Sequence, residues 1–224
     1  MWGGAHSERH LLRANVLLLV LNVSLLIFIS FVPVAVREGL NRLLLTGIFL
    51  TSIYVIGSYS PRLITVMGLL VVLQWLARVI EWEHIAFLTG ALNSLYILYL
   101  VSRMAMQFAA ARRVTANTLL IAVNGYLLIG LICALYAMLI TRVVPNSFYI
   151  PREDTFLAAS THFHTFVYYT FINMSTVGFG DIIPVTDAGR ALAILLAVTG
   201  PLYIAIIIAF LVGKYADGIM GTEK

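Results

Sequence analysis

Charged residues are scarce in this sequence. Its 224 residues include 14 lysines and arginines and 10 aspartates and glutamates, which together make 11% of the chain. Soluble domains average about 25% charged and about 45–50% apolar residues, whereas 61% of this chain is hydrophobic. The composition therefore excludes a soluble globular protein and predicts an integral membrane protein. The net charge of +4 does not indicate a nucleic-acid partner, because the basic residues are scattered singly between apolar runs.

Cysteine is nearly absent, and no catalytic constellation stands out. The single cysteine, Cys133, lies inside an apolar run, so a disulfide framework and a cysteine-based metal site are both excluded. We find no paired acids, activated nucleophile or nucleotide-binding loop, and therefore expect neither an enzyme nor an organic cofactor. His162 and His164 form an H-x-H pair with no apparent third ligand. The pair is either sensitive to external pH or simply interfacial.

Long apolar runs dominate what is present. Because about 20 apolar residues cross a bilayer as a helix, each run predicts one membrane span. The six runs are 14–34, 40–58, 62–80, 85–108, 115–141 and 188–213. We divide the chain into a cytoplasmic amino terminus (1–13), a peripheral four-helix domain (14–108), a linker (109–114), a pore domain (115–213) and a short cytoplasmic carboxyl terminus (214–224). The predicted class is an all-helical membrane protein, with no ligand-binding domain after Gly213.

The stretch between the fifth and sixth runs differs from the other connections. It begins polar, becomes apolar and aromatic, and then turns glycine-rich. We predict a re-entrant helix from Phe156 to Met174, which is tolerable at membrane depth because protein rather than lipid surrounds it. The negative end of its dipole would then face the interior of the assembly.

The residues after this helix read T-V-G-F-G-D, from Thr176 to Asp181. An extended backbone can present successive carbonyl oxygens to a dehydrated cation in place of its water. Such an arrangement needs alternate residues in the left-handed region, which Gly178 and Gly180 adopt without a Cβ clash. The segment therefore predicts an ion-coordinating backbone. Its members are Thr176, Val177, Gly178, Phe179 and Gly180, with the ligand oxygens running from Thr176 to Phe179.

This segment, between an apolar helix and a following span, resembles the pore signature of potassium channels. The resemblance covers roughly residues 115–213 and implies passive, K+-selective conduction. It also implies a homotetramer with six spans per subunit, because the chain has one filter segment and one segment cannot encircle an ion. No partner beyond further copies and membrane lipid is implied.

The resemblance further assigns supporting residues. The paired aromatic residues of the pore helix fall on Tyr168 and Tyr169, and we expect Tyr169 to hydrogen-bond Asp181 behind the filter. The glycine hinge of the inner helix falls on Gly200. Pro201 follows it and predicts a kink, because proline removes a backbone hydrogen bond. That bend is either fixed or a moving gate.

Two further features concern voltage and orientation. Six-span relatives that sense voltage carry several arginines in the fourth span, whereas 85–108 contains only Arg103. We therefore predict weak or absent voltage sensing, with Arg103 as a cytoplasmic flank. The basic residues, Arg112 and Arg113 above all, place both chain ends in the cytoplasm of the cell membrane.

Three other functions are alternatives to K+ conduction. A non-selective cation channel is disfavoured because both filter glycines are present. A transporter of the type with several filter-like repeats in one long chain is disfavoured because the chain has one such segment. A non-conducting membrane adaptor is excluded only by a measured current.

Overall fold

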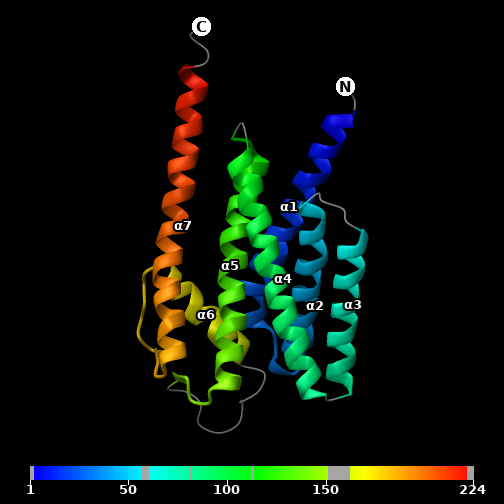
Figure 1. Ribbon diagram of the computed structural model, residues 1–224, viewed down its shortest axis with the longest axis vertical. Helices are drawn as coiled ribbons and strands as arrows, with labels where there is room; N and C mark the ends of the chain where they lie inside the picture. Colours follow the sequence, from blue (N-terminus) through cyan, green and yellow to red (C-terminus); the bar gives the residue numbers. More distant parts are fainter. Residues whose placement is uncertain (1–2, 57–60, 81, 112–113, 151–161, 221–224) are drawn as a thin grey trace. The chain divides into compact units, whose positions relative to one another are not determined.

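The computed structural model describes residues 3–56, 61–80, 82–111, 114–150 and 162–220 (Figure 1). The chain divides into two compact units, Met1–Gln107 and Phe108–Lys224. Arg112 and Arg113, which carry the orientation prediction, lie outside the described residues. Within each unit, helices pack against one another.

Among the described residues, the first unit contains four long helices, which overlap the first four predicted ranges. They are α1 (Gly3–Leu26), α2 (Val34–Ile56), α3 (Pro61–Val79) and α4 (Glu83–Ala110), with a short 3-10 helix, η1 (Phe28–Phe31), between α1 and α2. Helix α1 ends eight residues before the predicted end of its run at 34. The chain turns before Pro33, which disfavours helix in the residue preceding it. The Arg37 side chain then donates from Nε and Nη2 to the Val32 carbonyl, at 3.2 and 2.9 Å.

Hydrogen bonds between polar side chains join helices of this unit. The Asn93 amide on α4 donates to the Gln74 amide oxygen on α3, and the Trp75 indole on α3 donates to Thr46 Oγ1 on α2 at 3.3 Å. Such interhelical bonds stabilise helix packing where lipid offers no polar partner. The buried polar residues of the unit are Asn15, Asn22, Asn41, Thr51, Ser52, Thr89, Asn93 and Ser94.

The second unit contains α5 (Ala116–Val143), α6 (His162–Met174) and α7 (Asp187–Met220), which pack against one another. Thr115 caps α5: its hydroxyl accepts from the Thr118 amide at 3.2 Å, and its own amide donates to Thr118 Oγ1 at 3.3 Å. This reciprocal capping fixes where α5 starts. Among the described helices, α5 and the Asp187–Lys214 part of α7 are long and apolar enough to cross a membrane.

Two short strands correct the all-helical expectation, and the fold is mostly helical instead. Strand β1 (Phe148–Tyr149) pairs antiparallel with β2 (Ile183–Pro184). The Ser147 carbonyl extends the pairing by accepting from the Val185 amide at 2.8 Å. This pair ties the chain after α5 to the chain before α7.

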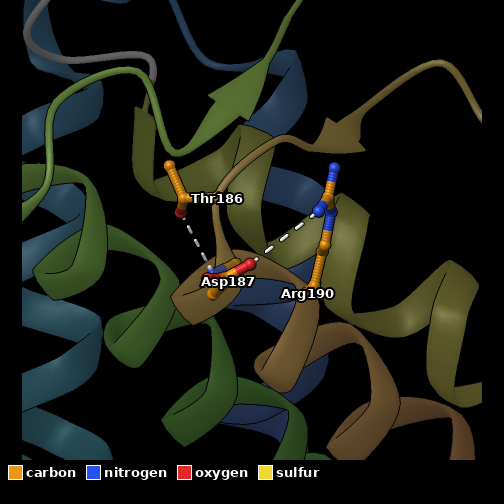
Figure 2. Close-up of polar contacts among 4 residues, drawn as sticks. Thr186, Asp187 and Arg190 are labelled. Carbon is orange, nitrogen blue, oxygen red and sulfur yellow. Dashed lines mark hydrogen bonds and ion pairs between the residues drawn. The ribbon is translucent and has the colours of Figure 1, made fainter.

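Helix α7 starts directly after the strand pair. Figure 2 shows Thr186 at its amino end, where Thr186 Oγ1 accepts from the Gly189 amide at 3.4 Å, and the ion pair between Asp187 and Arg190 at 3.8 Å. A hydroxyl cap and an acid in the first turn both complement the unpaired amides of a helix start. A Cβ at Gly189 would lie 2.9 Å from the Ser147 carbonyl oxygen, so glycine lets α7 begin against the strands.

Candidate functional site

The candidate site is built on α6, the shortest of the three helices in the second unit. Its predicted start at Phe156 lies outside the described residues, and it ends at Met174 as predicted. Phe166 and Tyr169 are 0% and 1% exposed, and their rings lie 5.1 and 5.3 Å from the Phe148 ring. These contacts fix the rotation of α6 about its own axis.

The backbone turns back on the last carbonyls of α6. The Ser175 amide donates to the Phe171 carbonyl at 2.9 Å, and the Thr176 amide donates to the Asn173 carbonyl at 3.1 Å. The Ile172 carbonyl accepts from two amides, those of Val177 at 3.0 Å and Gly178 at 3.1 Å. The orphan carbonyls of a helix end are thereby satisfied, and the start of the T-V-G-F-G segment is held to the helix.

Alternate residues of this segment are left-handed. The φ angles are +64° at Thr176, +50° at Gly178 and +74° at Gly180, while Val177 and Phe179 between them do not have positive φ. The conformation expected at both glycines is therefore present. The positive φ of Thr176 is an outlier, because this residue is β-branched. Backbone strain of this kind collects at functional sites.

The segment is open to its surroundings in a single chain. Every residue from Ser175 to Asp181 is exposed, including the apolar side chains of Val177 at 53% and Phe179 at 69%. Among the residues that the structure describes, a Cβ added at Gly178 or Gly180 would meet nothing within 4 Å.

Tyr168, and not Tyr169, holds Asp181. The Tyr168 hydroxyl donates to Asp181 Oδ2 at 2.7 Å, and Asp181 Oδ1 accepts from the Ile182 amide at 3.1 Å. The expected Tyr169 bond is wrong, because consecutive helix residues point about 100° apart and Tyr169 faces the Phe148 ring. The Tyr169 hydroxyl is buried without a hydrogen-bond partner in the described part of the chain.

The Tyr168 bond also affects the titration of that phenol. The hydrogen bond to Asp181 raises the pKa of Tyr168, with burial and the negative charge of Asp181 acting in the same direction. A raised pKa means that the neutral, donating phenol persists to higher pH than an isolated tyrosine.

Gly200 and Pro201 lie within α7, which continues through the proline without a break. Gly200 is buried and faces the end of α6. The predicted role of this pair as a gate hinge concerns motion and stays a prediction.

The two histidines lie at the start of α6. His162 is the first residue of the helix, and the His164 ring lies 5.9 Å from the Phe163 ring. Within the residues that the structure describes, no three histidine, cysteine or acidic side chains are grouped as a metal site would require.

Two long apolar helices pack against a short helix and a strained loop, an arrangement that suits a membrane-embedded pore module. Residues 127–216 match the family model described as "Ion channel". That stretch, somewhat less than half of the chain, is similar to the pore domains of ion channels. Comparisons with curated proteins and with solved structures each found no match.

Proposed function

We propose that the protein conducts K+ passively and selectively through a filter formed by residues 176–180. The alternation of positive φ at Thr176, Gly178 and Gly180 carries this proposal. An alternating backbone turns successive carbonyls toward one side, and rings of such oxygens replace the hydration shell of K+. The carbonyls of Thr176, Val177, Gly178 and Phe179 are the proposed ligands, with the Thr176 hydroxyl at the inner end.

We propose that four copies surround the conduction axis. The exposed side chains of Val177 and Phe179 support this assembly, because apolar groups beside the filter need a cover that one chain does not supply. Helix α7 likewise exposes Val198 at 57% and Leu202 at 54%. In the proposed homotetramer, neighbouring subunits cover the filter side chains and part of α7, and lipid covers the remaining apolar surface.

The first four helices are proposed to cross the cell membrane without sensing voltage strongly. Arg103 is the only basic residue between His84 and Phe108. Its side chain is half-buried within α4, which continues to Ala110. One charge that crossed the whole field would contribute about 2.3 kcal/mol per 100 mV, and a single arginine near one end crosses less. Both chain ends are proposed to be cytoplasmic.

The same proposal assigns roles to the residues that support the filter. Tyr168 and Asp181 hold the outer end of the filter through their hydrogen bond, and Tyr169 packs behind it. The gate hinge at Gly200 and Pro201 is tested by Pro201→Ala, because unchanged open probability in that variant would remove the hinge.

Ion flux through the purified protein in liposomes tests the proposed function. K+ and Na+ gradients are compared at several membrane voltages, and Ba2+ serves as the pore blocker. We expect K+-selective, Ba2+-sensitive flux with little voltage dependence. Equal Na+ flux would instead indicate a non-selective cation channel. Absence of flux under every condition, including in Pro201→Ala, would favour a non-conducting adaptor.

A further inference from the structure

Helix α7 approaches the end of α6 so closely that only glycine fits at position 200. A Cβ at Gly200 would lie 2.0 Å from the Met174 carbonyl oxygen and 2.7 Å from both the carbonyl carbon and the Cα of Met174. All three atoms belong to the backbone and cannot turn aside as a side chain can. Elsewhere on α7, a Cβ at Gly213 would meet nothing within 4 Å. Steric packing therefore requires glycine at position 200 but not at position 213.

A second contact fixes α7 one turn further along. The Tyr203 hydroxyl donates to the Ala122 carbonyl on α5 at 2.8 Å. A Cβ added at Gly125 on α5 would lie 2.4 Å from the same hydroxyl, so glycine at that position leaves room for it. The Tyr126 ring lies 5.7 Å from the Tyr203 ring and 6.3 Å from that of Phe171 on α6. Between residues 200 and 203, α7 is thus held to both α5 and α6 and has little freedom to withdraw.

The proposed filter begins two residues after Met174, the residue whose backbone Gly200 contacts. Met174 is fully buried and lies two residues before the strained Thr176. The preceding carbonyls, of Ile172 and Asn173, hold the amides of Thr176, Val177 and Gly178. A displacement of the Met174 backbone therefore moves the acceptors that hold the inner end of the filter.

We infer that Gly200 is a positioning residue for the filter: its missing Cβ lets α7 contact the Met174 backbone and thereby fixes the end of α6. This inference rests on the proposed function and assigns a role different from a hinge. A hinge needs backbone freedom near residue 200, whereas positioning needs empty space at residue 200 itself. The two requirements are separated by moving the glycine one position along the helix.

Four variants of the full chain carry the test: Gly200→Ala, Gly213→Ala, Thr199→Gly, and the double variant Thr199→Gly/Gly200→Ala. The double variant keeps a flexible glycine two residues before Pro201 but removes the space at residue 200. Each variant is measured for thermal stability in detergent and for the ratio of K+ to Na+ flux in liposomes.

We expect Gly200→Ala and the double variant to lose selectivity by about tenfold, which corresponds to about 1.4 kcal/mol and lies within the range that overpacking costs in folding stability. Both should also melt at a lower temperature than Gly213→Ala, and Thr199→Gly should stay near wild type. Failure of both alanine-200 variants to assemble, while the other two assemble, is the stronger form of the same result.

Recovery of wild-type selectivity and stability in the double variant would overturn the inference, because flexibility alone would then suffice. Unchanged behaviour of Gly200→Ala would overturn it as well. If the wild-type protein itself lacks K+ selectivity, the proposed function fails. In that case the melting temperatures of Gly200→Ala and Gly213→Ala still decide whether α7 needs glycine at position 200 to pack against the end of α6.

Discussion

The two adjacent tyrosines of α6 provide a sharp prediction, because removal of their hydroxyls should have opposite consequences. Tyr168→Phe deletes the 2.7 Å hydrogen bond to Asp181. Tyr169→Phe deletes a buried hydroxyl that has no hydrogen-bond partner in the described part of the chain. Both changes keep the ring and remove one oxygen, so each is the control for the other.

The size of the effect follows from exposure. A hydrogen bond to a charged group contributes about 1.5–3 kcal/mol, but Tyr168 is 40% exposed and Asp181 is exposed, so water replaces part of the lost interaction. We expect a loss of about 1 kcal/mol in the conducting form of the filter, which is about fivefold in an equilibrium constant. For Tyr169→Phe, the loss of an unsatisfied buried hydroxyl is neutral or stabilising.

The K+ dependence of flux measures this loss. Because bound K+ stabilises the conducting filter by mass action, Tyr168→Phe should need about fivefold more K+ to reach half-maximal flux. Tyr169→Phe should match wild type or melt at a slightly higher temperature. A larger shift in Tyr169→Phe than in Tyr168→Phe would refute the assigned hydrogen bond and restore the pairing that the resemblance first suggested.

Three further predictions concern the backbone, the packing of α6 and voltage. Gly178→Ala places a Cβ on a residue with φ of +50°, at a cost of about 1–2 kcal/mol per subunit, and should reduce the ratio of K+ to Na+ flux. Gly130→Ala would bring a Cβ within 2.3–2.8 Å of the Phe171 ring. We expect it to destabilise the fold by about 1 kcal/mol, as measured by thermal unfolding, because a side chain yields more easily than backbone. Arg103→Gln should leave the voltage dependence of flux unchanged.

Each of these predictions has a control. Gly39→Ala, where a Cβ meets nothing within 4 Å, should behave as wild type, and a similar effect there would remove the conformational argument at Gly178. Adding Phe171→Leu to Gly130→Ala should restore part of the stability, and a further loss would contradict the steric reason. A steep change in voltage dependence for Arg103→Gln would assign α4 a sensing role.

Local signals predicted the helices and the strained segment well. Apolar runs between polar breaks overlap six long helices in the described part of the chain, although α1 begins and ends earlier than its run. The end of α6 at Met174 followed from the onset of the T-V-G-F-G segment. The left-handed conformation of Gly178 and Gly180 followed from the absence of a Cβ. These features depend on residues that are near one another in the sequence.

Features set by distant contacts were missed. The choice between Tyr168 and Tyr169 depends on the rotation of α6, which packing against Phe148 decides. The pairing of β1 with β2 joins segments more than thirty residues apart. The positive φ of Thr176 is imposed by hydrogen bonds to the end of α6, and no propensity of threonine indicates it.

The reversal potential of the purified wild-type channel in a planar bilayer, with K+ on one side and Na+ on the other, tests the central claim most directly. K+ selectivity at this filter predicts a reversal potential displaced far from zero, with the K+ side negative, and a current that Ba2+ abolishes. A reversal potential near zero, with equal currents in both directions, would contradict K+ selectivity at the filter formed by residues 176–180.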